Sequence, residues 1–194
     1  SAVGPLVQQS PEHENLFCLP ASINLAGAEI DMVGASQREK VLASALATYV
    51  DQTSPRIDFI FIDSPPSLGL LTVNALVAAT EVLVPIQCEY YALEGVTQLI
   101  ANIERVKKAL NPSLDISSIL LTMFDNRTNL STDVANEVRK YFPEKTLDAT
   151  IPRSVRLSEA PSYGQTAITF DPKNSGSLAY QEAAIELAQR GDHV

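Results

Sequence analysis

The chain carries the segment RIDFIFIDSPPSLG at residues 56–69, and the fold prediction starts from it. Residues 57–62 are mostly β-branched or aromatic, which is typical of a strand buried on both faces of a parallel sheet. Asp63 follows where this strand leaves the sheet, and two prolines then prevent the hydrogen-bonded ladder from continuing. Ligands of open α/β sheets bind at the carboxyl ends of strands. This position favours a Walker-B role for Asp63, in which the carboxylate orders Mg²⁺ and its water beside a nucleotide phosphate. The alternative is a strand-terminal Asp that only caps the following turn.

The bulk composition suits one globular α/β domain with a full core, because 45% of the 194 residues are hydrophobic and 19% are charged. We therefore expect residues 1–194 to form a single domain in which the polar segment 1–15 is a flexible lead-in. The formal net charge of −9 argues against a protein that holds nucleic acid through a broad basic face. A few local arginines remain compatible with this charge.

The two cysteines, Cys18 and Cys88, lie in or beside apolar runs, which predicts reduced core thiols of a cytosolic protein. The two histidines lack partners at ligand spacing, so no histidine metal site is predicted. No apolar run approaches the roughly 20 residues that are needed to cross a bilayer.

Strands and helices are expected to alternate along the rest of the chain. The predicted strands are 16–19, 57–62, 81–87, 116–124 and 146–151, and the predicted helices begin at Ile23 and cover 36–50, 70–79, 92–110, 131–142 and 177–190. Pro85 is expected at the end of its strand or at a bulge, because proline has no N–H for a ladder. The alternation predicts an α/β fold whose mostly parallel sheet has helices on both faces.

Five phrases resemble the ParA/Soj chromosome- and plasmid-partitioning ATPases, a family with a P-loop NTPase fold. They are PASINLAGAE (20–29), IDSPPSLGLLT (62–72), PIQCEYYALEG (85–95), LTMFDNRTNL (121–130) and IPRSVRLSEAPS (151–162). The resemblance keeps their order and covers the chain from about Leu19 to the last helix.

The chain departs from the family at the phosphate site. The family's ATP site uses a glycine-rich P-loop with a terminal Lys-Thr and a second, signature lysine. Here Gly4 is the only glycine before Gly27, and the pattern Gly-Lys-[Ser/Thr] does not occur. The backbone N–H cradle, the Mg²⁺-ligating hydroxyl and the switch aspartate that follows them are therefore not among these residues. We expect the chain to be the C-terminal portion of a ParA-like protein that is inactive as an ATPase by itself.

The resemblance implies a nucleotide site. It assigns Mg²⁺ binding through water to Asp63, contacts with the adenine ring and ribose to Met123, Pro152, Arg153 and Ser154, and a position near the nucleotide at the dimer interface to Glu89. Ser154 stands where an asparagine is expected, which puts one polar contact in doubt. The alternatives are that Met123 is an ordinary core residue and that Glu89 is a solvated surface carboxylate.

The resemblance also implies that Arg127 and Arg156 contact DNA without regard to its sequence, with Arg153 and Lys173 as further candidates. Isolated arginines on one face of a dimer can bind phosphates even in an acidic chain. The alternatives are an ordinary surface arginine or an ion pair with a nearby acid such as Asp125 or Glu159.

The function that the resemblance implies is an ATP-dependent DNA-partitioning switch in the cytoplasm, associated with the nucleoid. ATP and Mg²⁺ would be the cofactors of the intact protein, with none expected tightly bound to this chain. ATP would close a homodimer that coats DNA, and a ParB-like centromere-binding protein would stimulate hydrolysis. No membrane partner is expected. One alternative is a MinD-like membrane-surface ATPase, which needs a basic amphipathic C-terminal helix, whereas the last helix here carries Glu182 and Glu186. The other is a non-enzymatic fragment that only binds partners.

Overall fold

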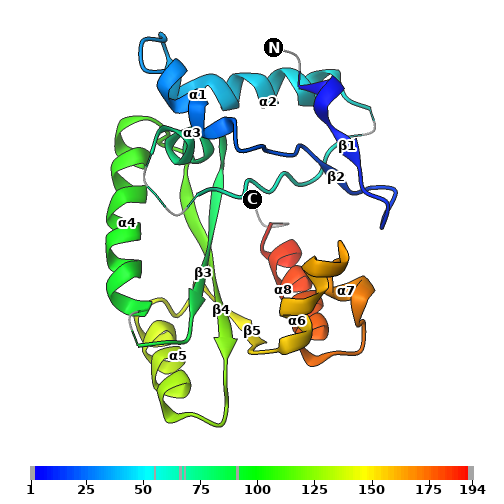
Figure 1. Cartoon of the computed structure of the whole chain (residues 1–194). Coiled ribbons are helices and arrows are strands. Elements are labelled where there is room, and N and C mark those ends of the chain that lie inside the picture. The colour runs from blue at the N-terminus through cyan, green and yellow to red at the C-terminus, as the bar shows by residue number, and fades with distance from the viewer. Residues whose placement is uncertain (1–2, 55, 66, 68, 91, 192–194) are drawn as a thin grey trace. The chain divides into compact units, whose positions relative to one another are not determined.

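The structure, a computed structural model, describes residues 3–54, 56–65, 67, 69–90 and 92–191 (Figure 1). The chain groups into two compact units, unit 1 (Ser1–Thr80 with Asn102–Asp115) and unit 2 (Glu81–Ala101 with Ile116–Val194). The expectation that the whole chain forms one domain stays a prediction.

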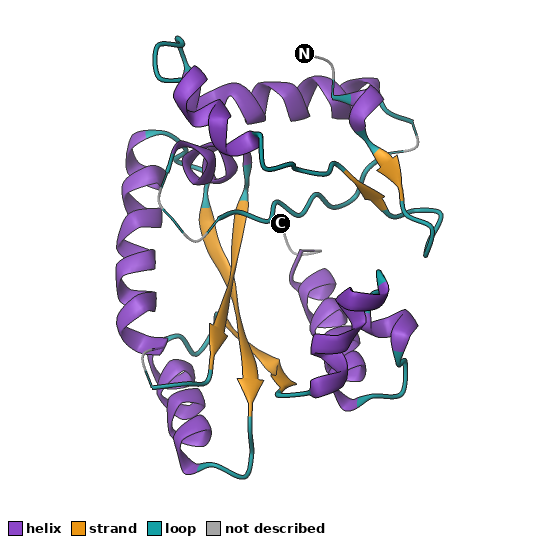
Figure 2. Ribbon diagram, in the orientation of Figure 1, coloured by secondary structure: helices purple, strands orange, loops and turns teal. Residues whose placement is uncertain are grey.

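Unit 2 is built on a three-stranded sheet in the order β3-β4-β5, formed by β3 (Glu81–Gln87), β4 (Asp115–Phe124) and β5 (Thr146–Pro152). β4 and β5 pair in parallel, and the arrowheads of all three strands point the same way (Figure 2). The pairing of β4 with β5 is irregular on both sides of Leu121, which lies opposite Thr150. These three strands were predicted within a residue of their ends, and the α/β class with a parallel sheet is confirmed.

Helices lie on both sides of this sheet (Figure 1). On one side is α5 (Asn129–Tyr141), together with the start of α4 (Ala92–Ala109), which continues into unit 1. On the other side are α6 (Val155–Glu159), the 3₁₀ turn η3 (Ala160–Tyr163), α7 (Ala167–Phe170) and α8 (Ser175–Gly191). The small residues of α8 let it pack closely on β5. The core under α8 is formed by Leu120 of β4, Leu147 and Ile151 of β5, and Ala179 and Ala183 of α8.

Unit 1 contains a short antiparallel pair and several helices. The pair is β1 (Gln8–Gln9) with β2 (Phe17–Cys18), and the helices are η1 (Gly4–Leu6), α1 (Leu25–Asp31), η2 (Arg38–Lys40), α2 (Val41–Gln52) and α3 (Leu70–Ala78). The buried side chain of Asn74 holds α3 to the start of α2. Its Oδ1 accepts the Leu42 N–H at 3.1 Å, and its Nδ2 donates to the Arg38 carbonyl at 2.8 Å.

The prediction of a buried strand at residues 57–62 is wrong for this structure. The segment has no strand conformation, and the side chains of Phe59 and Phe61 are 63% and 77% exposed. A strand exists only through hydrogen bonds to a neighbouring strand, and no strand pairs with this segment among the described residues. The apolar pattern is present, but Phe59, Ile60 and Phe61 are exposed, and Ile57 and Ile62 are only partly buried.

Smaller differences have local causes. The expected lead-in 1–15 contains β1, and both β2 and Cys18 are exposed rather than buried, because a two-stranded pair has little core to pack against. Cys88 is buried, as predicted. Pro85 lies inside β3, not at its end, and is tolerated because β3 is an edge strand of the sheet that the described residues form.

Several helix ends also differ from the prediction. Thr128 caps α5, with its hydroxyl accepting the Ser131 N–H, so this helix begins two residues before the predicted start at residue 131. Asn24 precedes α1, which begins at Leu25 and not at Ile23. Residues 153–164, for which a loop with one helical turn was expected, contain α6 and η3, and α7 was not predicted.

Candidate functional site

The carboxyl end of β4 turns sharply at Met123. This residue has a φ of 54°, in the left-handed region that a non-glycine residue occupies at a cost of roughly 1–2 kcal/mol. The pairing with β5 is irregular just before Phe124, whose carbonyl accepts the Arg153 N–H at 2.9 Å. The backbone thus leaves the ladder at a defined point and delivers residues 125–128 to the end of the sheet. The side chain of Met123 is half-buried.

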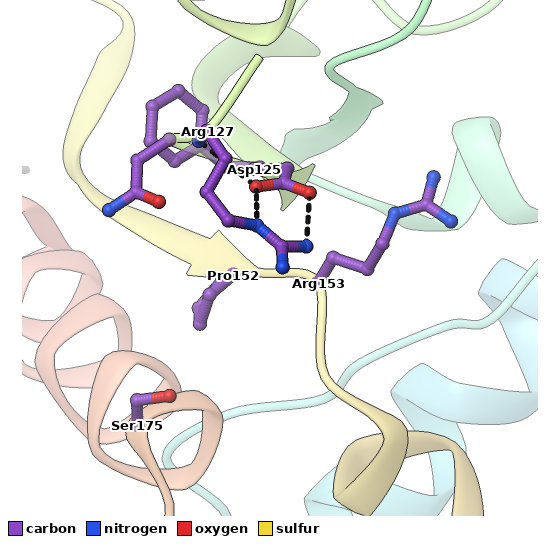
Figure 3. A pocket seen from close by; sticks show the side chains of 7 residues that line it. Asp125, Arg127, Pro152, Arg153 and Ser175 are labelled. Carbon is purple, nitrogen blue, oxygen red and sulfur yellow. Dashed lines mark hydrogen bonds and ion pairs between the residues drawn. The ribbon is translucent and has the colours of Figure 1, made fainter.

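Asp125 and Arg127 form a bidentate ion pair in this turn (Figure 3). Arg127 Nε donates to Oδ1 at 2.9 Å, Nη2 donates to Oδ2 at 2.7 Å, and the Arg127 backbone N–H donates to Oδ1 at 3.0 Å. These bonds from the Arg127 side chain and backbone lower the pKa of Asp125 to about 2. The Arg127 side chain is 82% exposed, whereas that of Asp125 is only 17% exposed. The ion-pair alternative for Arg127 is therefore realised, with the cation on the outside.

A pocket of about 450 Å³ opens where β4 and β5 end and α8 begins (Figure 3). Its lining comprises Phe124, Asp125, Asn126, Arg127, Pro152, Arg153 and Ser175. Two predicted nucleotide residues, Pro152 and Arg153, are thus brought together with Arg127. Met123 and Ser154 are chain neighbours of this lining but are not part of it.

Ser154 has a structural partner. Its hydroxyl donates to Asn174 Oδ1 at 3.2 Å, and the same oxygen accepts the Gly176 N–H at 2.9 Å in the first turn of α8. The side chain of Asn174 therefore links the exit of β5 to the start of α8, which places Ser175 at the pocket. The prediction started this helix two residues later and missed Ser175, although an asparagine before a helical run is a typical N-cap signal.

Glu89 and Arg153 lie together although 64 residues separate them. Arg153 Nη2 donates to Glu89 Oε1 at 2.5 Å, and each side chain is about half exposed. Arg153 and Asp125 also line a second, larger pocket of about 1010 Å³, whose other walls come from β3, α4 and α5. Ser131 ties α5 to the exit of β3 there, since its hydroxyl donates to the Cys88 carbonyl at 3.1 Å.

Arg156 on α6 is held from several directions. Its Nε donates to Asp171 Oδ2 at 3.0 Å, and its Nη1 donates to Glu159 Oε2 at 2.8 Å. The guanidinium carbon lies 4.4 Å from the centroid of the Phe170 ring, which stacks on Tyr163 at 4.9 Å between centroids. Hydrogen bonds to Asp171 and then Glu159 raise the pKa of Arg156 further. The sequence suggested the pair with Glu159, but Asp171 and Phe170 are tertiary partners that no local spacing indicates.

Asp63 belongs to unit 1, where it is exposed on irregular backbone. Within the described residues, no three or more His, Cys, Asp or Glu side chains are arranged to hold a metal ion. A single carboxylate nevertheless fits the predicted role, because Mg²⁺ usually keeps several waters and takes one or two carboxylates together with substrate phosphates.

None of the helices in the described part of the chain is both long enough and apolar enough to span a membrane.

Comparisons with known proteins agree with the fold and identify similar proteins. Residues 2–116 match a protein family described as an AAA domain. The Soj sporulation initiation inhibitor protein of Bacillus subtilis is 51% identical over 178 residues, which are 92% of this chain and 69% of that protein. The chromosome-partitioning ATPase Soj of Treponema pallidum is 44% identical over 188 residues, 97% of this chain and 72% of that protein.

Among solved structures, cobyrinic acid a,c-diamide synthase from Mycobacterium smegmatis, with bound ADP and magnesium, is similar at a TM-score of 0.80 and 34% identity. The match covers 99% of this chain and 69% of that one. The cell division ATPase MinD of Pyrococcus furiosus matches at a TM-score of 0.73 over 97% of this chain and 71% of that one, but its 20% identity shows a shared fold alone. From its relatives and its α/β architecture, the chain belongs to the Soj/ParA family of chromosome-partitioning ATPases.

Proposed function

We propose that this chain carries the base-binding side of an ATP site and a set of DNA-contacting arginines in an ATP-dependent DNA-partitioning switch. One observation carries the proposal. Pro152 and Arg153, predicted for the nucleotide, and Arg127, predicted for DNA, line the same pocket at the carboxyl ends of parallel strands. This edge of a sheet is where ligands of α/β proteins bind.

The pocket has the chemistry to hold a purine. Phe124 and Pro152 supply apolar surface for a flat ring, and Pro152 keeps the exit of β5 rigid. Asn126 adds an amide that can pair with ring nitrogens. The adenine contacts predicted for Met123 and Ser154 remain proposals, as does the position of Glu89 near the nucleotide.

At the phosphates, Asp63 is assigned to hold Mg²⁺ through a bound water molecule. A magnesium ion bound there would neutralise charge on the phosphate oxygens, in the way that Walker-B sites work. The related synthase that binds ADP and magnesium supports these cofactors for the family. Asp63 is exposed, so its carboxylate is accessible to a hydrated ion.

For DNA, the proposal assigns Arg127 and Arg156 to phosphate contacts. Both guanidinium groups lie at the surface after a strand, Arg127 on the turn after β4 and Arg156 on α6 after β5, where a duplex can reach them. In the intact protein, an ATP-bound homodimer would place two copies of each arginine on DNA, and a ParB-like protein would act as the stimulating partner. Association with the nucleoid would follow from this binding.

The membrane-surface alternative is less favoured. The basic residue in the last turn of α8, Arg190, donates to the carbonyls of Glu144, Lys145 and Thr146 at 3.1–3.2 Å. It is therefore committed to holding α8 against β5. A lipid-binding helix would need its cations free on a polar face.

The test is DNA binding by the full-length protein with ATP and Mg²⁺, measured by fluorescence anisotropy on two unrelated duplexes. We expect binding that needs ATP and does not distinguish the duplexes. Arg127→Ala and Arg156→Ala should each weaken it and lower the slope of log affinity against log salt by about 0.9. If both variants bind like the parent at every salt concentration, the two arginines are ordinary ion-pair residues and the proposal fails.

A further inference from the structure

Each arginine at the candidate DNA surface is already bound to carboxylates of its own chain. Arg127 is held by Asp125, Arg153 by Glu89, and Arg156 by both Glu159 and Asp171. The contacts are 2.5–3.0 Å long, as in charge-assisted hydrogen bonds. A phosphate that binds these arginines must therefore compete with the carboxylates that already pair with them.

The balance of charge at these contacts is not basic. Three arginines face four carboxylates, which leaves a net charge of −1 over the set. A DNA phosphate that contacts one of these arginines is also repelled by the carboxylate bound to it. The pairs are surface pairs, so each is weak enough for a phosphate to displace.

The geometry of the two DNA candidates differs in a useful way. Both carboxylate oxygens of Asp125 accept hydrogen bonds from the Arg127 guanidinium, and one of them also accepts the Arg127 backbone N–H. The pair is therefore local and rigid. Arg156 bridges an acid on its own helix and one after α7, and it lies over the ring of Phe170. The ring keeps the guanidinium plane oriented even if the acids are neutralised.

We propose that Asp125, Glu159 and Asp171 are restraining residues that compete with DNA phosphates for the arginines. The proposal rests on the proposed function, since it concerns the affinity of the same DNA contacts. Its consequence is that one copy of the chain binds DNA poorly.

Replacing the restraining carboxylates should change the affinity for DNA in the opposite direction to replacing the arginines. Asp125→Asn, Glu159→Gln and Asp171→Asn each remove a competitor and leave the arginine in place, so that affinity for DNA should rise. We expect about a two- to fivefold rise for each, the scale of an exposed ion pair, and a larger rise for the triple variant. The salt slope should not change, because the number of phosphates contacted stays the same.

The experiment compares these variants in the full-length protein with ATP and Mg²⁺, on the same duplexes, over about 50 to 200 mM KCl. Glu137→Gln is the matched control, since Glu137 is an exposed carboxylate on α5 and the change removes the same charge. Asp125→Asn keeps an oxygen for the Arg127 N–H, and thermal unfolding checks that each variant folds.

Tighter binding by the three acid variants at unchanged slope, with Glu137→Gln like the parent, supports the restraint. Affinities that are unchanged or lower overturn it, and so does an equal rise in Glu137→Gln, which would indicate net charge alone. Arg127→Ala and Arg156→Ala run beside them. If these fail to weaken binding, the proposed function itself fails, whereas weakening by the arginine variants without a rise in the acid variants rejects the restraint alone.

Discussion

Replacing Glu186 by alanine should weaken the attachment of α8 to β5 and destabilise unit 2. The Glu186 carboxylate accepts the backbone N–H groups of Asp148 and Ala149 at 3.1 and 3.2 Å. It also accepts a hydrogen bond from Arg190 at 2.9 Å, within the same helix. One side chain therefore joins the helix to two positions of the strand.

The magnitude follows from the charge and the exposure of the carboxylate. A hydrogen bond to a charged group contributes about 1.5–3 kcal/mol, and less where water can replace it. The Glu186 side chain is 21% exposed, and the Asp148 N–H belongs to an exposed residue, so water takes over part of the lost bonding. We expect the free energy of unfolding to fall by about 2–3 kcal/mol in Glu186→Ala, and by about 1 kcal/mol in Glu186→Gln, which keeps an acceptor.

The assay is urea denaturation followed by circular dichroism, with hydrogen exchange at the amides of Asp148 and Ala149. Glu182→Ala is the control, because Glu182 is exposed on the same helix and its loss should change stability by no more than about 0.5 kcal/mol. A Glu186→Ala variant as stable as this control, with both amides still protected, would show that the contacts do not stabilise the junction.

Four further outcomes are expected. Asn111→Ala should destabilise unit 1 by about 1–2 kcal/mol and increase hydrogen exchange near the end of α3, because the Asn111 amide donates to the carbonyls of residues 76, 77 and 79. The carboxyl of Asp125 should titrate near pH 2 by NMR, and its pKa should rise in Arg127→Ala while staying below its ordinary value, because the backbone N–H of residue 127 and the charge of Arg153 remain. Since the folded pKa is the lower one, this pair stabilises the turn above about pH 4 and stops doing so as the pH falls to about 2. The 194-residue chain alone should not hydrolyse ATP above background, because it lacks a P-loop lysine and backbone nest, and a turnover that Asp63→Ala abolishes would contradict this. It should also self-associate through residues 57–62, so a monodisperse monomer in sedimentation at tens of micromolar, with these amides protected, would refute that expectation.

The strands of unit 2 could be predicted because their signal is local and their partners lie in the same unit. Residues 81–87, 116–124 and 146–151 are apolar runs bounded by turn residues, and each finds a neighbour in the sheet. Helix ends were less accurate. Thr128, Ser131 and Thr132 are all good cap residues, and only the backbone conformation at Thr128 decides among them.

The candidate site was predicted in its residue types but not in its contacts. Arg153 and Glu89 were both named, but their ion pair joins the exits of β5 and β3, two strands that β4 separates in the sheet. Phe170 and Asp171 were missed because they reach Arg156 through the turn that α7 makes. Such partners are set by tertiary packing, which no spacing in the sequence encodes.

Residues 57–62 and the surface arginines make the same physical point from opposite sides. The pattern of residues 57–62 satisfies every local requirement of a buried strand, but strand formation is a property of a pair of segments, and the described residues supply no second one. Arg127 satisfies every local requirement of a phosphate contact, but its partner, Asp125, stands two residues away and already occupies it. In the first case a missing partner leaves an apolar segment exposed, and in the second a present partner reduces the affinity for an outside ligand. In both cases an internal and an external partner compete for the same groups of this chain. The partner that binds with the larger free energy decides whether residues 57–62 or Arg127 act as part of the structure or as a binding surface.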